Sequence, residues 1–461
     1  MLGAKMRFFD WSAILITILL GISFAFQAAT EPPSYMVFLW TGWGVVVVLT
    51  VINTVSAIRR SRSLDVHTIG GRAARPTAMP FVDPGPDLAD SLLAGPRGRR
   101  LLLEYATESE RLSGRAMRAD SFIRAASSAS YEMDPGKGTS VVMLTARVTG
   151  ANPEPDPEIV TPEEVAERLA RVELAEPTPQ LFRGCLAQAV DNARYWQPPA
   201  GEDALAASDP MRRELRRIAE HLLASPYSAW WFTPADPESQ QVVVWEDDQK
   251  HQPLPLEVSL ADPSEALRSS RKKLIEQEEE AKFEQPADPV KCYSAEWWSR
   301  PSSKLSSTTR TLFDGSPVGL WAVEDGFNWK SAYSYAVEVP DGLRVYEIDS
   351  ARAWVKLCWQ FPMDCSARKR HDWYMTTGRT GRWAMPDWAR VAERYDGVHL
   401  QVGAYLEAAG TAIPVDEETA TVIAGWDPDT TYWFAPGIRY LNDPVRWKLV
   451  PRGMENTWQR C

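Results

Sequence analysis

Two long apolar runs stand near the start of the chain. Residues 11–29 (WSAILITILLGISFAFQAA) carry no charge, and residues 35–58 (YMVFLWTGWGVVVVLTVINTVSAI) repeat this pattern after a turn at Glu31-Pro32-Pro33. Each run approaches the ~20 residues that a helix needs to cross a bilayer. A cleaved signal peptide fits the first run less well, because a second run follows at once without a small-residue cleavage site. The pattern predicts a transmembrane helical hairpin within residues 1–60.

The charges that flank these runs predict their orientation. Only Glu31 lies in the connecting loop, whereas the basic residues lie outside it: Lys5, Arg7, Arg59, Arg60 and Arg62. Basic flanks stay on the cytoplasmic side of a membrane. We therefore expect a protein of the bacterial inner (cytoplasmic) membrane, with the lipid bilayer as one partner and both termini in the cytoplasm.

Residues 61–94 and 95–258 differ in pattern. The first segment is rich in Gly, Pro and Arg and has no sustained period, which indicates a flexible basic linker. The second contains a capping box at Thr161 and Glu164, an apolar helix face with Leu215, Ile218 and Leu222, and strands at 139–148 and 241–245. These features predict an α+β domain over 95–258.

Residues 259–289 read as a polar connecting helix. Asp262 is a suitable N-cap, Pro263 suits the first helical position, and few apolar residues follow. A helix without an apolar face is usually a solvated spacer between domains.

The last predicted domain, 290–461, contains 13 of the 20 tryptophans. Its pattern predicts strands at 318–324, 343–348, 396–402 and 430–434, and helices around 329–335, 351–359 and 387–394. Short strands alternating with short helices indicate an α+β domain with a mixed or split β-sheet. The predicted fold class is thus two N-terminal transmembrane helices followed by two cytoplasmic α+β domains.

Composition narrows the chemistry. The net charge of -11 argues against a general nucleic-acid coat. The five cysteines are scattered without CxxC spacing, as in reduced cytosolic proteins. The five histidines lie far apart and form none of the usual ligand spacings, so we predict no metal site.

One basic stretch is dense in chemistry: residues 365–383 (CSARKRHDWYMTTGRTGRW). Guanidinium groups bind phosphate in pairs of hydrogen bonds, and nearby rings can stack on a planar group. The stretch could hold a phosphate-bearing ligand or contact nucleic acid, or it could be a solvated loop whose arginines pair with carboxylates. The candidate ligand-binding residues are Arg368, Arg370, His371, Arg379, Arg382 and Trp383.

The aromatic residues of 319–349 admit two interpretations. Trp321, Phe327, Trp329, Tyr333 and Tyr335 could fill a core between sheet and helix, as buried aromatic residues normally do. They could instead form the rim of a pocket for a flat ligand, with a nearby arginine as the charged partner.

The run TTRTLF…GLWAVEDGFNWKSAYSYAV…LRVYEID…RYDGVHLQV resembles the core of ADP-ribosyltransferase-like domains. The resemblance implies NAD as substrate, with Arg310 on its phosphates or ribose and Trp321 and Tyr333 framing the nicotinamide. Glu407 would act on the ribose hydroxyl, which makes Arg310, Tyr333 and Glu407 the catalytic candidates. The chain departs from that family in having neither Ser-Thr-Ser after the first strand nor an ExE motif.

A second resemblance rests on the GLW strand and on the pairs Trp426-Asp427 and Trp433-Phe434. It is to an uncharacterised membrane-anchored family of GC-rich Gram-positive bacteria and their phages, which carries no known activity. The first functional hypothesis is therefore a membrane-tethered cytoplasmic protein whose Trp-rich domain binds a protein partner or an anionic ligand. The alternatives are an ADP-ribosyltransferase-like enzyme using NAD, and nucleic-acid contact through Arg368–Arg382. No cofactor is predicted unless the NAD hypothesis holds.

Overall fold

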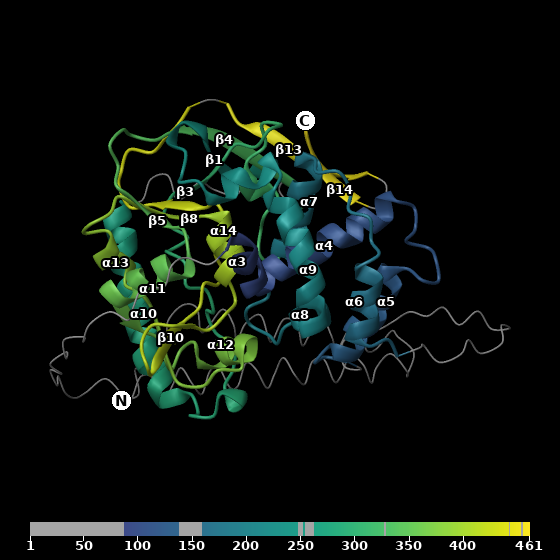
Figure 1. The fold of residues 1–461 in the computed structure, drawn as a ribbon. Helices are drawn as coiled ribbons and strands as arrows, with labels where there is room; N and C mark the ends of the chain where they lie inside the picture. Colours follow the sequence, from purple (N-terminus) through teal and green to yellow (C-terminus); the bar gives the residue numbers. More distant parts are fainter. Residues whose placement is uncertain are drawn as a thin grey trace, which may run out of the picture. The chain divides into compact units, whose positions relative to one another are not determined.

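The computed structural model describes residues 87–137, 159–247, 252–253, 262–326, 329–441, 443–452 and 455–461. All of them belong to one compact unit, Pro84–Cys461. Helices dominate its first part, and two mixed sheets with the long helix α10 and several short helices make up the rest (Figure 1).

Seven helices precede the first strand within the described residues. They are α3 (Leu88–Ala94), α4 (Pro96–Leu112), α5 (Phe122–Met133), α6 (Pro162–Leu169), α7 (Pro179–Asp191), α8 (Gly201–Ala207) and α9 (Asp209–Leu223). Two 3-10 turns follow, η1 (Pro226–Phe232) and η2 (Pro237–Ser239). The expected capping box is present in α6, where Thr161 and Glu164 cap each other's backbone. In α9 the predicted apolar face is buried through Leu215, Ile218 and Leu222.

A larger sheet carries strands from both predicted soluble domains. Its order is β14-β13-β4-β1-β3-β11-β8-β5, with β12 on β4 and β2 on β1. The bounds are β1 (Gln240–Asp247), β2 (Gln252–Pro253), β3 (Ser307–Arg310), β4 (Ser331–Glu338), β5 (Val345–Ile348), β8 (Gly397–Leu400), β11 (Thr431–Trp433), β12 (Arg439–Tyr440), β13 (Val445–Arg452) and β14 (Glu455–Arg460). Only β5 and β8 pair in parallel; the other pairs are antiparallel.

A smaller sheet has the order β6-β7-β10-β9. It consists of β6 (Pro362–Asp364), β7 (Arg382–Pro386), β9 (Ile413–Pro414) and β10 (Thr419–Thr421). The accompanying helices are α10 (Pro263–Glu284), α11 (Ala351–Gln360), α12 (Arg370–Thr377), α13 (Trp388–Val391) and α14 (Val402–Ala408), with 3-10 turns η4 (Pro289–Lys291) and η5 (Val318–Leu320).

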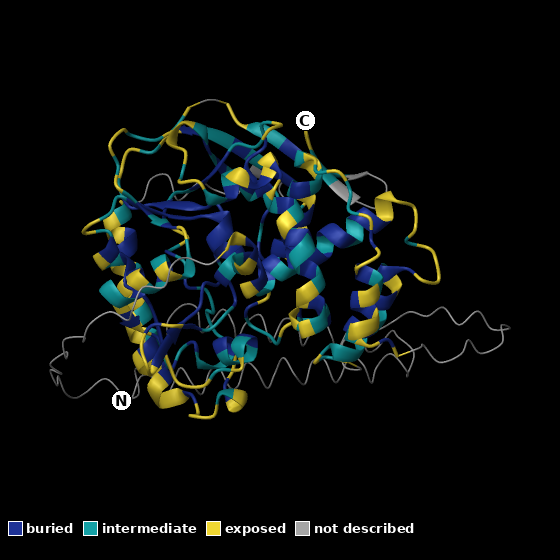
Figure 2. Cartoon of the chain, viewed as in Figure 1, coloured by how far each residue is buried: buried dark blue, intermediate teal, exposed yellow. Residues whose placement is uncertain are grey.

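The helical part packs directly against the Trp-rich part. Glycine is required at this contact, because a Cβ on Gly95 would lie 2.1 Å from the carbonyl oxygen of Leu406 in α14. A Cβ on Gly98 would lie 3.0 Å from the same carbonyl oxygen and 2.0 Å from that of Leu92. One continuous apolar core runs from Leu92 through Trp354 to Trp426, and Figure 2 shows β3 and β8 as largely buried strands. The polar segment 259–289 therefore does not separate two independent cores.

The predicted fold class is wrong. No helix among the described residues is long and apolar enough to span a bilayer. What the structure shows in place of two α+β domains is a set of helices joined to mixed sheets in one unit. The predicted spans 11–29 and 35–58, the linker up to residue 86 and the strand at 139–148 lie outside the described residues.

Two local predictions also fail. Residues 329–335 were expected in a helix, but β4 occupies most of this range, paired on one side with β1 and on the other with β13. Burial alternates from Ala332 to Tyr335, as in a strand, and pairing with two neighbours outweighs a short helical pattern. The strand expected at 318–324 is replaced by the turn η5.

Candidate functional site

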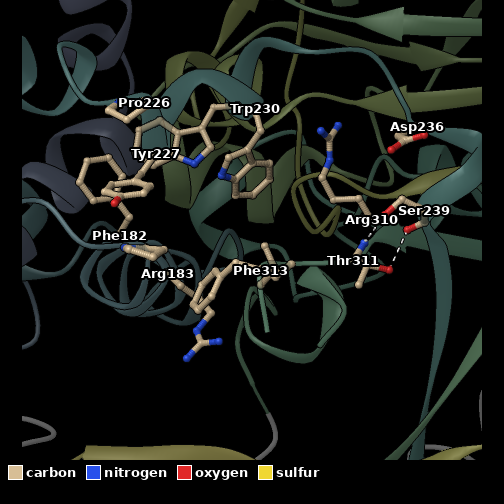
Figure 3. A pocket seen from close by; sticks show the side chains of 13 residues that line it. Phe182, Arg183, Pro226, Tyr227, Trp230, Asp236, Ser239, Arg310, Thr311 and Phe313 are labelled. Atoms are coloured by element: carbon tan, nitrogen blue, oxygen red, sulfur yellow. Dashed lines mark hydrogen bonds between the residues drawn. The ribbon is translucent and has the colours of Figure 1, made fainter. Parts of the chain in front are cut away.

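The largest of the hollows described here is a cavity of about 330 Å³ between the helical part and the end of β3. We call it the aromatic–arginine pocket. Its apolar walls come from α7, η1 and the residues after β3, and polar groups lie at its edges (Figure 3). The lining residues are Pro179, Phe182, Arg183, Pro226, Tyr227, Trp230, Trp231, Asp236, Ser239, Arg310, Thr311, Leu312 and Phe313.

Short capped elements place the aromatic side chains of the pocket. Thr178 caps the first turn of α7, from which Phe182 reaches the cavity. Ser225 caps η1, and Pro226 at the first position starts this tight turn. Three residues per 3-10 turn bring Tyr227 and Trp230 onto one side, where both line the pocket.

Arg310 ends β3 and enters the pocket wall beside the Trp230 ring, 5.3 Å from its centroid. Its Nε donates to Asp429 Oδ1 at 2.5 Å, and its backbone N–H donates to Oδ2 at 2.8 Å. Nη1 donates to Thr233 Oγ1 at 2.7 Å, and Nη2 to the carbonyl oxygens of Thr233 and Pro234 at 3.4 and 3.0 Å. The guanidinium group is therefore fixed in one orientation.

A buried charge network lies behind Arg310. His399 of β8 has Nδ1 2.7 Å from Glu347 Oε2 and Nε2 3.4 Å from Asp429 Oδ1. Burial alone would lower the pKa of His399, but the neighbouring carboxylates of Asp429 and Glu347 outweigh it and raise this pKa. Glu347 also accepts a hydrogen bond from the backbone N–H of Ala235 at 3.0 Å. The network thus holds segment 233–235 at both of its ends.

Asp429 adopts an uncommon backbone conformation to make these contacts. Its φ of 62° lies in the left-handed region, although it is not glycine. Asp tolerates this region better than most residues, yet a strained buried position of this kind commonly marks a functional site. Here the conformation lets one carboxylate accept both the backbone and side-chain N–H of Arg310.

Arg183 provides the second guanidinium group of the pocket. It pairs with Asp314 and covers the Trp321 ring, with its central carbon 3.6 Å from the ring centroid. Burial lowers the pKa of Arg183 despite this carboxylate. Trp321 itself donates from Nε1 to Ser316 Oγ at 2.8 Å. Trp321 therefore supports the pocket from behind Arg183 and is not among its lining residues.

The lining contains two guanidinium groups and one carboxylate, Asp236. An arginine has five N–H donors, and four hydrogen bonds from the Arg310 side chain are accounted for among the described residues. At least one N–H is left for a ligand. A flat ring can lie against Trp230, Tyr227 or Phe182, while an anionic or acceptor group meets Arg310.

The other catalytic candidates lie elsewhere. Tyr333 pairs with Val244 in β1, four residues along from Gln240, which pairs with Arg310. At ~3.3 Å per residue, Tyr333 is ~13 Å from Arg310 along the strand direction alone. Glu407 of α14 accepts a hydrogen bond from the backbone N–H of Ala351 at 3.1 Å and so caps α11. Neither residue lines the aromatic–arginine pocket.

Most of the aromatic side chains of residues 319–349 serve packing. Trp329 stacks on Trp245 with ring centroids 6.0 Å apart, and Tyr335 meets Tyr440 edge to face at 5.3 Å. Phe327 lies outside the described residues. Only Trp321 comes near the pocket, through Arg183.

The basic stretch 365–383 forms the segment that follows β6, then α12 and the start of β7. Arg370 donates to the carbonyl oxygen of Pro286, and His371 Nδ1 lies 2.8 Å from that of Pro289. Arg379 donates to the carbonyl oxygens of Arg382 and Glu418 at 3.0 and 2.7 Å.

The remaining candidates of the stretch are also held by the protein. Arg382 pairs with Glu418 at 3.7 Å, and Trp383 is buried edge to face against Trp373. The backbone N–H of Arg368 donates to Glu278, whereas its side-chain Nε has no partner among the described residues. Most of these polar groups hold neighbouring segments together and do not converge on a hollow.

A second buried acid lies apart from the pocket. Neither carboxylate oxygen of Glu324 has a hydrogen-bond partner among the described residues, and the hydroxyl groups of Tyr195 and Tyr405 are likewise unpartnered there. Burial and the neighbouring Asp427 raise the pKa of Glu324 to about 8. No group of three or more His, Cys, Asp or Glu side chains in the described part of the chain is arranged to hold a metal ion.

The sequence pointed to Arg310, but most of the other residues of the aromatic–arginine pocket were not predicted. The aromatic wall comes from 226–232 (PYSAWWF), inside the predicted first domain, where four of seven residues are aromatic. The density of rings in this short run was the available signal. Asp429 and His399 gave no local signal, because their roles depend on strands that meet only in the folded sheet.

No family model, curated protein or solved structure matches this chain. The resemblances to ADP-ribosyltransferase-like domains and to the family from Gram-positive bacteria stay predictions. The same holds for a protein partner, the lipid bilayer and the cytoplasmic location.

Proposed function

We propose that the chain is a binding protein whose aromatic–arginine pocket takes a small, flat organic molecule carrying an anionic group. The observation that carries this proposal is the position of Arg310. Its guanidinium group stands in a wall of aromatic rings, fixed from behind by Asp429 and beside Trp230. Rigid donors bind an anion without an ordering cost, which improves affinity.

The size of the pocket limits the ligand. A cavity of about 330 Å³ stands at the lower end of the usual ~300–1,000 Å³ for small-molecule sites. One ring system with its charged substituent suits this space, and the rest of a longer molecule would extend into solvent. A flat protein interface needs no such hollow, so the pocket favours the anionic ligand over the protein partner.

Binding of matched acids and amides tests the proposal. Ligand-observed NMR on the full-length chain would compare mono- and bicyclic aromatic carboxylates with their carboxamides, with NAD as a further probe. We expect the acids to bind about tenfold more tightly than the amides, because one charge-assisted hydrogen bond is worth ~1.4 kcal/mol or more.

Two variants localise the binding. Trp230→Ala should weaken the acids at least about tenfold, since a ring contact of ~1 kcal/mol and its buried area are lost. Tyr293→Ala is the matched control, because Tyr293 is an exposed aromatic residue outside the pocket. Equal affinity for acids and amides, no acid binding at millimolar concentration, or unchanged binding in Trp230→Ala would contradict the proposal. Binding of NAD without binding of the aromatic acids would favour the hypothesis of an ADP-ribosyltransferase-like enzyme.

A further inference from the structure

A second hollow lies between α10 and residues 296–304, with a volume of about 160 Å³. We call it the serine–lysine pocket. Its polar lining includes Ser269, Ser270 and Lys273 of α10 and Arg300, Ser303 and Lys304 of the opposite segment. The helix predicted as a solvated spacer thus forms one wall of a hollow.

The charge of this lining is positive in a chain whose net charge is -11. Three cationic side chains face one carboxylate, Glu296, and Lys273 Nζ pairs with it at 2.5 Å. Among the described residues, neither Arg300 nor Lys304 makes an ion pair within 4 Å, although Arg300 donates to the carbonyl oxygen of Pro301 at 3.2 Å. Arg300 also lies over the Trp298 ring, 5.4 Å from its centroid, and its charge offsets part of the rise that burial causes in the pKa of Asp427. The charge of Lys304 therefore remains available to an anion, and Arg300 adds to the positive charge around the hollow.

The hydroxyl groups complement these charges. Ser269, Ser270 and Ser303 line the hollow together with Ser302, whose Oγ accepts from the backbone N–H of Lys304 at 3.3 Å. Phosphate oxygens accept several hydrogen bonds at once, and charge-assisted bonds from Arg and Lys are the strong ones. The ring of Trp298 and the side chain of Leu274 also line the hollow and offer an apolar surface to an organic group.

The backbone of residues 296–299, opposite α10, is fixed by hydrogen bonds to other parts of the protein. Buried Lys369 donates from Nζ to the carbonyl oxygens of Glu296 and Trp298 at 2.7 and 2.8 Å. Ser299 donates its backbone N–H to the carbonyl oxygen of Ala424 at 2.8 Å, and Trp388 donates to that of Ser299 at 3.1 Å. Because four hydrogen bonds fix this backbone, the hollow exists before any ligand arrives.

We propose that the serine–lysine pocket is a binding site for a small phosphate-bearing molecule. The charge excess, the hydroxyl groups and the fixed wall are the features that a phosphate group requires. A volume of about 160 Å³ takes one phosphate with a small organic part. Inorganic phosphate and a phosphate monoester share this chemistry, and the site is independent of the aromatic–arginine pocket.

Thermal unfolding of the full-length chain tests the site with inorganic phosphate and glycerol 3-phosphate as probes. Sodium chloride at equal ionic strength is the reference. We expect a saturable rise in Tm of several degrees with at least one of these phosphates. If a monoester gives half of the Tm shift at a tenth of the inorganic phosphate concentration, the ligand is an organic phosphate. If both probes need the same concentration, the ligand is inorganic phosphate.

Charge variants make the test specific. Lys304→Gln and Ser270→Asp should each raise the phosphate concentration needed for half of the shift at least about tenfold. Lys272→Gln is the matched control, because Lys272 neighbours Lys273 on α10 but is 77% exposed and does not line the hollow. Trp230→Ala should leave the shift unchanged.

A rise in Tm no larger than that in sodium chloride would overturn the proposal. So would an equal loss in Lys272→Gln and Lys304→Gln, since that pattern reports general surface charge. These outcomes do not depend on aromatic acids, so this site and the aromatic–arginine pocket can fail separately.

Discussion

Arg310 links the surface of the aromatic–arginine pocket to the interior of the protein. Its partner Asp429 is almost fully buried, and the same carboxylate faces His399. Removing one member of a buried charge pair leaves the other without compensation, which costs much more than an exposed pair contributes. The residue is thus structural and ligand-facing at once.

We expect Arg310→Ala to lower the free energy of unfolding by ~3–5 kcal/mol, because the Asp429 carboxylate stays buried and loses its donors. Urea unfolding of the full-length chain measures this change. Arg344→Ala is the control, since Arg344 pairs with Asp396 at the surface and should cost below ~1 kcal/mol. Equal costs in the two variants would show that the Arg310 pair is not critical for stability.

Because the pKa of Glu324 is raised in the folded state, we expect the stability of the protein to depend on pH. Its pKa rises from 4.5 to about 8 on folding, so the folded state favours the neutral acid. The contribution to stability is complete below pH 4.5 and is lost as the pH rises towards 8. In this window the loss is at most ~1.4 kcal/mol per pH unit.

Urea unfolding at about pH 5 and about pH 8 checks this sign. Glu324→Gln, which keeps the neutral shape, should lose less stability over the interval than the natural chain. Glu338→Gln serves as the control, because Glu338 lies at the surface and pairs with Arg439. Identical pH profiles for the natural chain and Glu324→Gln would refute the prediction.

At the scale of elements, α10 is anchored to the rest of the protein by a buried carboxylate. Glu278 accepts hydrogen bonds from the backbone N–H groups of Ala367 at 2.9 Å and Arg368 at 2.8 Å. Asp387 adds a contact to Arg271 at 2.7 Å. The helix is therefore packed along its length despite its polar composition.

Glu278→Ala should cost ~1–3 kcal/mol, because two buried N–H groups before α12 lose their acceptor. Glu276→Ala on the same helix, whose side chain is 66% exposed, should stay within ~0.5 kcal/mol. Guanidinium chloride unfolding compares the two. If both cost the same, α10 is a spacer as its sequence indicated.

Local signals explain which elements could be predicted. The cap and first-turn residues of α6 and α10 act within a few positions, and both helices start where Thr161 and Asp262 indicate. The strands at 241–245 and 343–348 are also confirmed as β1 and β5. β4 was missed because β1 and β13 decide its conformation, and these lie far away in sequence.

The same distinction governs the site. Arg310 was named only through the resemblance to ADP-ribosyltransferase-like domains, which implies an arginine on an early strand, and Arg310 does end β3. Asp429 was not, because its role depends on a left-handed backbone and on contact with a residue 119 positions away. The polar lining of the serine–lysine pocket was not predicted either, because the polar sequence of α10 indicated a solvated spacer.

At the scale of the whole molecule, β1 lies between β3 and β4 although it precedes α10. A fragment covering 290–461 would lack this strand and expose unpaired edges of β3 and β4. Exposed edges promote association between chains. We expect this fragment to aggregate when made alone and to become soluble when residues 84–258 are made with it.

Size-exclusion chromatography and near-ultraviolet circular dichroism distinguish the outcomes. A soluble 290–461 fragment with ordered tryptophan signals would show that the Trp-rich part folds by itself. The spectrum of the full-length chain in the same buffer is the reference.

The central place of β1 also bears on how the chain is made. When β1 leaves the ribosome, neither β3 nor β4 has been synthesised, and the last residue of β4 follows on the order of ten seconds later. During that time only the end of β1 can pair, with β2, while Val242 and Val244 lack the neighbouring strands β3 and β4. Slower synthesis after residue 247 would lengthen this exposure, so codon usage downstream of β1 should influence the yield of folded protein.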